Sequence, residues 1–214
     1  MIARRTRIKF CGVTRSEDAQ LAVDLGVDAI GLVFTRRSPR FVGVAHAHLI
    51  RRALPPFVTA VALFMDDEPA WIEEVIAVVQ PDVLQFHGSE VAGFAAGFAR
   101  PYIKAVPMAS VADVAAYAAQ HPDAAALLLD SHAAGAIGGS GDAFDWTRVP
   151  RMLPKPMVLA GGLDAQNVAQ AIALVRPYAV DVSSGIEMIP GIKHAEKMRR
   201  FVDAVHAANA QTMD

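Results

Sequence analysis

Two residues with reactive side chains stand at the ends of apolar stretches. Cys11 is the last residue before Gly12, which ends the run 8–12, and Asp130 follows the run 124–129. A thiolate can act as a general base, and a buried carboxyl group is costly unless it is paired or functional. If both reach one pocket, they form an acid–base pair for proton transfer beside a carbonyl or an imine. The structural alternatives are a small buried hydrophobe for Cys11 and a loop cap for Asp130.

Two turns of small residues follow apolar runs late in the chain. Glycines let a backbone approach a ligand closely, and free N–H groups at a turn or helix start favour an anion. We therefore predict that the two turns clamp a phosphate group. Their residues are Gly161 and Gly162 after the run 158–160, and Ser183, Ser184 and Gly185 after the run 179–182.

Further polar features follow other apolar runs. Arg40 comes after Pro39, which stiffens the turn, and a rigid guanidinium binds a carboxylate or phosphate bidentately. We expect it to hold a second anion. His87 follows the run 82–86 and is either catalytic or a structural hydrogen-bond partner. The stretch 138–141, which includes Gly141, is either a lid that adds a phosphate contact or flexible filler. The acids at 66–67 are interpreted as helix-start residues only.

The pattern of apolar runs indicates whether these residues can meet. Eight strand-like runs alternate with eight helical segments at nearly constant spacing, which is typical of parallel βαβ units. We predict a single-domain (β/α)₈ TIM barrel over residues 1–214 with its core at about 7–208, and an open doubly wound sheet is the alternative. In a barrel, the active site lies at the carboxyl ends of the strands, where Cys11, Arg40, His87 and Asp130 fall.

The predicted elements are short and evenly distributed. The strands are expected at 8–12, 28–34, 57–64, 82–86, 102–106, 124–129, 158–160 and 179–182. The helices are expected from Thr14 or Ser16 to 25, and at 44–54, 66–79, 89–99, 110–120, 145–153, 165–175 and 195–208.

Composition limits the classes of function. The 214 residues are 53% hydrophobic and 20% charged with a net charge of −2, which is typical of a globular α/β protein without a nucleic-acid partner. The single cysteine excludes an intrachain disulfide and a CxxC zinc site. We see no metal-ligand cluster and no GxGxxG fingerprint, so we expect no metal and no cofactor. Without a signal peptide or an apolar run long enough to span a bilayer, we expect a cytoplasmic protein with no membrane partner.

Seven blocks of sequence resemble, in order, those of the phosphoribosylanthranilate isomerase family of the tryptophan pathway. The resemblance runs from residue 7 to about 205, and the blocks together are far more specific than any one alone. They are KFCGVT at 9–14, SPR at 38–40, LQFHG at 84–88, LD at 129–130 with GGSG at 138–141 and FDW at 144–146, AGGL at 160–163, DVSSGIE at 181–187, and PGIK at 190–193.

This resemblance implies an Amadori rearrangement without a cofactor. N-(5-phosphoribosyl)anthranilate would become 1-(2-carboxyphenylamino)-1-deoxyribulose 5-phosphate, with Asp130 as general acid and Cys11 as general base. Arg40 would hold the anthranilate carboxylate, while Gly162, Ser184 and Gly185 would contribute to the phosphate site. The expected partner is a small phosphorylated substrate, and the expected state is a monomer or a homodimer.

Two other functions fit a phosphate-binding barrel. One is another phosphosugar enzyme on the same scaffold, such as an epimerase, which would require different acid–base residues and commonly metal ligands. The other is a non-catalytic phosphometabolite-binding barrel, which would need neither Cys11 nor Asp130.

Overall fold

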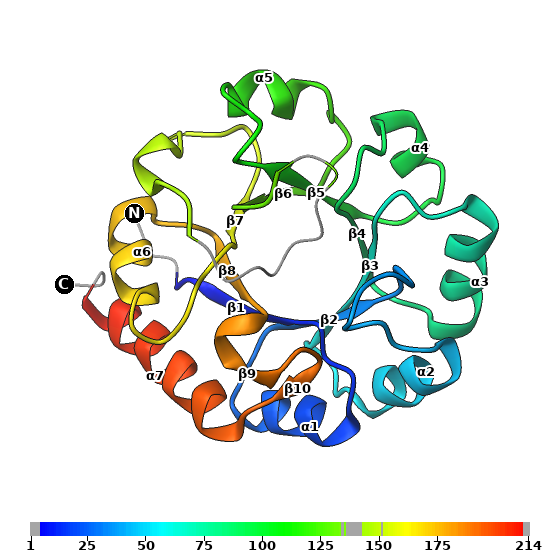
Figure 1. Cartoon of the computed structure of the whole chain (residues 1–214), viewed down its shortest axis with the longest axis horizontal. Helices are drawn as coiled ribbons and strands as arrows, with labels where there is room; N and C mark the ends of the chain where they lie inside the picture. Colours follow the sequence, from blue (N-terminus) through cyan, green and yellow to red (C-terminus); the bar gives the residue numbers. More distant parts are fainter. Residues whose placement is uncertain (1–4, 134, 136–142, 151, 212–214) are drawn as a thin grey trace.

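Eight parallel strands close into a barrel in chain order, and β1 pairs with both β2 and β8 (Figure 1). The computed structural model describes residues 5–133, 135, 143–150 and 152–211. It confirms the predicted (β/α)₈ barrel and is incompatible with an open doubly wound sheet. The strands are β1 (Arg7–Cys11), β2 (Ala29–Val33), β3 (Thr59–Phe64), β4 (Val83–Phe86), β5 (Tyr102–Pro107), β6 (Ala126–Asp130), β7 (Met157–Leu159) and β8 (Ala179–Val182).

The helices lie outside the barrel, and the three described next differ from the predicted segments by more than a shift of one end, or in where their first turn is capped. The helix expected at 89–99 is a short one, the helix expected at 110–120 starts later because Asp113 caps it, and the segment at 145–153 contains a single 3₁₀ turn in its described part. The helices are α1 (Ser16–Asp24), α2 (Val44–Ala53), α3 (Pro69–Val79), α4 (Ala92–Ala96), α5 (Val114–Ala119), η1 (Trp146–Arg148), α6 (Val168–Val175), η2 (Ser184–Ile186) and α7 (Ala195–Gln211).

A small hairpin that the sequence pattern does not predict follows the last barrel strand. It consists of β9 (Glu187–Ile189) and β10 (Ile192–Lys193), which pair antiparallel. Gly191 has a φ of +83° in its turn, a conformation that favours glycine. The hairpin places Glu187 and Lys193 beside each other in the interior.

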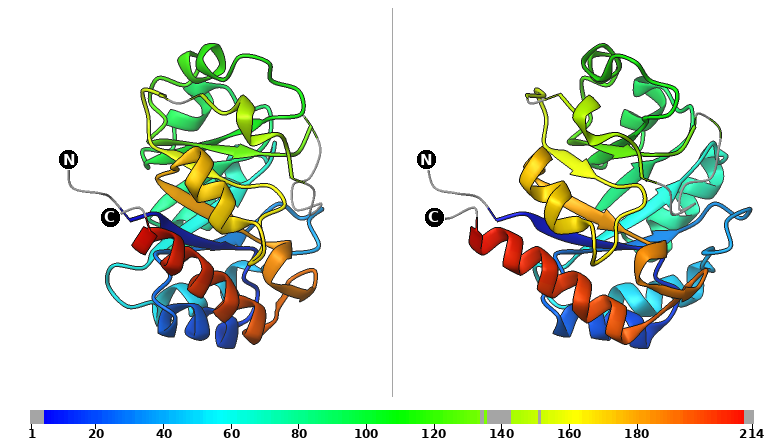
Figure 2. Two further views of the ribbon diagram at one scale, coloured as in Figure 1. Left: turned by 90° about the vertical axis from the view of Figure 1, so that its left-hand side faces the viewer. Right: turned by 60° about the vertical axis from the view of Figure 1, so that its left-hand side comes forward.

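Alternation along β1 explains why Cys11 faces the barrel interior. Phe10 points outward and makes an edge-to-face contact with Phe201 of α7 at a centroid distance of 6.1 Å. Figure 2 shows α7 running alongside β1 on the outside of the barrel. Lys9 points inward and pairs with Asp181 of β8. Since side chains alternate along a strand, Cys11 shares the inward direction of Lys9.

The same alternation along β6 directs Asp130 into the barrel. Leu127 and Leu129 belong to the cluster packed against α5, whereas Ala126 and Leu128 pack with the small interior side chains of neighbouring strands. Asp130 continues the inward series at the carboxyl end of the strand, where the next layer is the mouth of the barrel.

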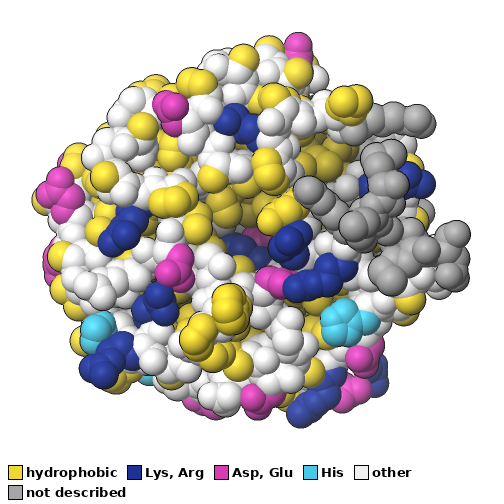
Figure 3. Space-filling model, turned by 180° about the vertical axis from the view of Figure 1, so that it is seen from behind, with side chains coloured by type: hydrophobic (Ala, Val, Ile, Leu, Met, Phe, Trp, Pro, Cys, Tyr) yellow, Lys and Arg dark blue, Asp and Glu magenta, His cyan; other side chains and the backbone are white. Residues whose placement is uncertain are grey.

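The face opposite to that of Figure 1 carries side chains of several types. In Figure 3, Lys and Arg side chains are interspersed with Asp and Glu around a central group of hydrophobic ones. Within the described part of the chain, no helix is both long and apolar enough to cross a membrane.

Candidate active site

A cavity of about 700 Å³, counted to its open mouth, lies at the carboxyl ends of the strands. Eight of the ten predicted site residues line it. Gly185 lies behind the lining, and Gly141, with the stretch 138–141, falls outside the described residues. The eight are Cys11, Arg40, His87, Asp130, Gly161, Gly162, Ser183 and Ser184.

Cys11 is buried at the end of β1. A glycine on the neighbouring strand makes room for it, since a Cβ atom at Gly31 would lie 2.9 Å from Cys11 Sγ. Lys9 and Asp181 form a buried ion pair below it, with 2.9 Å between Nζ and Oδ1. Burial raises the pKa of the Cys11 thiol above its usual value, although the charge of Lys9 opposes this. The free protein therefore holds Cys11 as a thiol at neutral pH.

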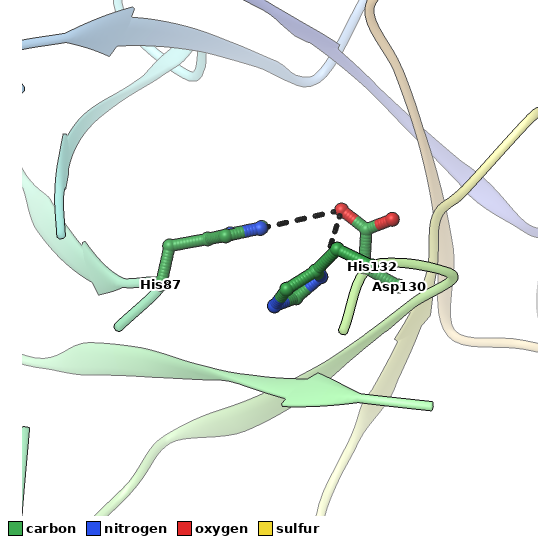
Figure 4. Close-up of side chains that lie close together, drawn as sticks. All are labelled: His87, Asp130 and His132. Atoms are coloured by element: carbon green, nitrogen blue, oxygen red, sulfur yellow. Dashed lines mark ion pairs between the residues drawn. The ribbon is translucent and has the colours of Figure 1, made fainter. Parts of the chain in front are cut away.

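Asp130 contacts two histidines, and one of them, His132, was not predicted as a site residue. Asp130 Oδ2 lies 3.4 Å from His87 Nε2 and 3.6 Å from His132 Nδ1, and all three side chains are buried. The imidazole rings stack on each other at a centroid distance of 4.2 Å. Figure 4 shows both rings reaching the same carboxylate oxygen. His132 lies two residues beyond the end of β6, where the alternation of a strand no longer fixes the direction of a side chain, so the sequence pattern gave no signal for it.

Burial governs the protonation of this group. It lowers the pKa of His87 to about 3, despite the opposing charge of Asp130, so His87 is neutral at pH 7. Burial is the largest influence on Asp130 and disfavours its ionised form, but the interactions with His132, His87 and the Ser131 backbone together outweigh burial and leave the pKa of Asp130 below its ordinary value. Asp130 is thus a carboxylate in the free protein.

Arg40 lies in the cavity wall, but its guanidinium already has a partner. Nε and Nη2 donate to the two carboxylate oxygens of Glu187 at 2.9 and 2.8 Å. Glu187 Oε1 also accepts from Lys193 Nζ at 2.9 Å. Within the described residues, Nη1 of Arg40 has no hydrogen-bond partner and is the donor left for a ligand. Glu187, which was not predicted as a site residue, therefore holds the guanidinium of Arg40 in place.

The two small-residue turns meet at one side of the cavity. Gly161 and Gly162 have φ angles of +82° and +62°, which favour glycine. Gly185 packs its backbone on Leu163, and a Cβ atom there would overlap the Leu163 carbonyl oxygen. The hydroxyl of Ser183 is buried and has no hydrogen-bond partner among the described residues. The turn thus presents a buried polar atom to the cavity, as an anion site requires.

Asp66 and Asp67 do more than begin a helix, which corrects the interpretation from sequence. Asp67 accepts from Thr35 Oγ1 at 2.6 Å and from the Met65 N–H at 2.9 Å. Asp66 accepts from the Ser89 N–H at 2.7 Å. These bonds tie the loops after β2, β3 and β4 together beneath the cavity rim.

The fold and the cavity define the class of protein: a (β/α)₈-barrel enzyme with its reactive groups at the carboxyl ends of the strands. The model of the N-(5′-phosphoribosyl)anthranilate (PRA) isomerase family matches residues 8–204. N-(5′-phosphoribosyl)anthranilate isomerase of Pseudomonas paraeruginosa is 54% identical over 201 residues, covering 94% of this chain and 95% of that protein. The chain therefore belongs to the N-(5′-phosphoribosyl)anthranilate isomerase family.

Solved structures agree with this membership. Phosphoribosyl anthranilate isomerase from Thermus thermophilus superposes with a TM-score of 0.86 at 36% identity, covering 94% of this chain and 99% of that one. Another structure of the family, in complex with reduced 1-(o-carboxyphenylamino)-1-deoxyribulose 5-phosphate, has a TM-score of 0.78 at 35% identity, with coverages of 94% and 99%. A structure of generated monomers of the dimeric phosphoribosylanthranilate isomerase from Thermotoga maritima has a TM-score of 0.78 at 33% identity, again with coverages of 94% and 99%.

Proposed function

We propose that the chain converts N-(5′-phosphoribosyl)anthranilate to 1-(2-carboxyphenylamino)-1-deoxyribulose 5-phosphate in tryptophan biosynthesis. The observation that carries this function is the shared cavity of Cys11 and Asp130, which reach it from β1 and β6. Family membership supports the same reaction. A non-catalytic binding barrel would gain nothing from a buried thiol and a buried carboxyl group in one pocket.

Cys11 and Asp130 divide the proton transfers between them in this proposal. Asp130 protonates the furanose ring oxygen, the C–O bond at the anomeric carbon breaks, and the nitrogen lone pair forms the Schiff base. Cys11 then removes the proton from C2 of the ribose, and the C–H electrons move toward the nitrogen to give an enolamine. Tautomerisation of the enolamine yields the ketone. The rearrangement is internal, so no external oxidant or reductant is needed.

For these roles, the general acid Asp130 must carry a proton and the general base Cys11 must be a thiolate, so the two groups together hold one proton. The free protein holds that proton on Cys11, because burial raises the pKa of its thiol, whereas the interactions with His132, His87 and the Ser131 backbone together lower the pKa of Asp130. The active form in this proposal is thus a minor tautomer of the free protein. A substrate that excludes water from the cavity and places its ring oxygen at Asp130 would favour the transfer.

Two anion contacts would orient the substrate between the acid and the base. The turns of Gly161–Gly162 and Ser183–Ser184–Gly185 would hold the 5′-phosphate, supported by their backbone geometry and by the unpartnered Ser183 hydroxyl. Arg40 would bind the anthranilate carboxylate through Nη1 while Glu187 keeps its other nitrogens in place. His87 would border the ring-opening end.

The cellular setting is proposed from the sequence and from relatives. A single domain acting in the cytoplasm without a cofactor or a nucleic-acid partner fits the composition and the biosynthetic family. A monomer or a homodimer is expected, and the dimeric relative from Thermotoga maritima makes the homodimer a concrete candidate.

The decisive experiment is a turnover assay on the wild-type chain. Phosphoribosylanthranilate is fluorescent, and its conversion is followed as loss of that fluorescence. The proposal expects enzyme-dependent loss and formation of the ketose product, identified by its ketone carbonyl signal in carbon NMR, because substrate and product are isomers of equal mass. Binding of a product analogue without any turnover would instead favour the phosphometabolite-binding barrel.

A further inference from the structure

Three potential metal ligands converge beside the cavity. His87 follows β4, Asp130 ends β6 and His132 lies two residues further on, and their ligand atoms all lie within 4.8 Å of one another. In Figure 4, both imidazole rings approach one oxygen of the carboxylate. Imidazole nitrogen and carboxylate oxygen are ligands that Zn²⁺ and similar ions bind in proteins. Since the three residues come from two separated segments, their spacing in the sequence gives no metal motif.

The distances from the Asp130 carboxylate to the two imidazole nitrogens are long for hydrogen bonds and fit ligand atoms arranged around a bound cation. In a tetrahedral site with metal–ligand bonds of ~2.1 Å, neighbouring ligand atoms lie ~3.4 Å apart. Asp130 Oδ2 lies 3.4 Å from His87 Nε2 and 3.6 Å from His132 Nδ1. Neither nitrogen has a hydrogen-bond partner within the described residues, although both are buried. Unpartnered buried nitrogens cost free energy, and coordination to a cation would satisfy both.

We propose that His87, Asp130 and His132 form a site for a divalent transition-metal ion such as Zn²⁺, and that the bound ion blocks turnover. His87 and Asp130 line the open cavity, so an ion can enter through the mouth and keep a water molecule in its fourth position. Coordination turns the two rings out of their present stack, in which the planes are 27° apart. The prediction that the ion blocks turnover rests on the proposed function, because a metal bound to the Asp130 carboxylate prevents it from taking up the proton that the general acid must deliver.

Metal binding is measured directly with Co²⁺, whose visible absorption reports a low-coordinate site, on the untagged full chain freed of metal by a chelator. One equivalent of Co²⁺ is expected to bind, and Zn²⁺ is expected to displace it. His132→Gln should weaken binding at least ~10-fold, the scale of loss seen when a metal's immediate surroundings are altered. His206→Gln, on the exposed face of α7, is the matched control and should bind like the wild type. Circular dichroism and thermal unfolding test whether each variant is folded. If His132→Gln is not folded, Asp130→Asn is used in its place.

Cys11 is the competing ligand, because it lines the same cavity and thiolates bind Zn²⁺ strongly. The proposed site predicts that Cys11→Ser retains Co²⁺ binding and that no thiolate-to-cobalt charge-transfer band appears. Three results would overturn the site. They are the absence of Co²⁺ binding by the wild type, binding of Co²⁺ by His132→Gln as tight as that by the wild type, and a charge-transfer band in the wild type that Cys11→Ser lacks. Turnover of the wild type is measured in the same titration and should be restored by chelator. If one equivalent of metal binds at the three residues and turnover is undiminished, the metal site is confirmed. The same result would show that Asp130 does not have its proposed catalytic role.

Discussion

Arg40 and Glu187 form a buried bidentate ion pair, with Nε–Oε1 and Nη2–Oε2 distances of 2.9 and 2.8 Å. The two residues are 147 positions apart, so the pair joins the loop after β2 to the hairpin after β8. Lys193 Nζ and the Gly191 N–H also donate to Glu187. One carboxylate thereby fixes a cavity-lining arginine and closes the hairpin.

Removing that carboxylate should destabilise the fold. Glu187→Gln leaves Arg40 and Lys193 as buried cations without a counter-charge, and we expect the free energy of unfolding to fall by about 3 kcal/mol. Urea unfolding followed by circular dichroism measures the change. The control is Glu196→Gln, which breaks the exposed Glu196–Arg200 pair on α7 and should cost no more than about 0.5 kcal/mol. Equal effects of the two variants would show that burial does not strengthen the Arg40–Glu187 pair.

The same carboxylate makes stability depend on pH at the acid end. Burial disfavours ionised Glu187, but Arg40 and Lys193 outweigh it and hold the pKa of Glu187 below its usual 4.5. A lowered folded-state pKa gives stability that is present above 4.5 and is lost as the pH falls through the folded-state pKa. The stability gap between wild type and Glu187→Gln should therefore be widest near neutral pH and shrink on acidification. Urea unfolding of both proteins at stepped pH values tests this, and a gap independent of pH would contradict it.

Titration of Cys11 tests the proposed distribution of the proton. Because burial raises the pKa of the thiol above its usual 9.0, thiolate absorbance in the ultraviolet should appear only above that pH. The chain has a single cysteine, so subtracting the spectrum of Cys11→Ser removes the tyrosine contribution. Thiolate already present at pH 7 in the free protein would show that the proton does not reside on Cys11.

Loss of either proposed catalytic group should affect turnover far more than binding. Cys11→Ala and Asp130→Asn should each lower kcat by about 10²–10⁴-fold, the range that a positioned acid or base contributes. Binding of the reduced product analogue, measured by calorimetry, should stay within a few-fold of the wild type because the anion contacts are intact. Normal turnover in both variants would remove them from the mechanism. A parallel loss of binding would instead assign them to substrate positioning.

The barrel was predictable because its signal is local and repeated. Each buried strand is a nearly continuous apolar run, and each is followed by a helical segment, so the order of elements follows from periodicity alone. The strand-end rule then placed Cys11, His87 and Asp130 at one mouth, and their shared cavity agrees with it. The least predictable helices, α4 and α5, are the short alanine-rich ones, where tertiary contacts and the Asp113 cap set the ends.

Contacts between distant segments were not predictable from the sequence. Glu187 was visible only as part of a motif, and its pairing with Arg40 depends on a hairpin that contains two very short strands. His132 sits beyond the end of β6, where the alternation of a strand no longer fixes direction. The stacking of His132 on His87 and its approach to Asp130 arise from the loop that follows β6.

Close packing of the turn at Gly185 should be required for the proposed phosphate site. Gly185→Ala would drive a methyl group into the Leu163 carbonyl and push the turns after β7 and β8 apart. Since misplacement of a binding group by about 1 Å can cost up to 10²-fold, we expect kcat/KM to fall by at least about 10-fold. Weaker binding of inorganic phosphate as a competitive inhibitor should accompany the loss. Gly93→Ala, in α4 with open space around it, is the control and should raise stability by about 0.5–1 kcal/mol without changing kinetics. If Gly185→Ala retains wild-type phosphate inhibition, close packing of the two turns is not what forms the anion site.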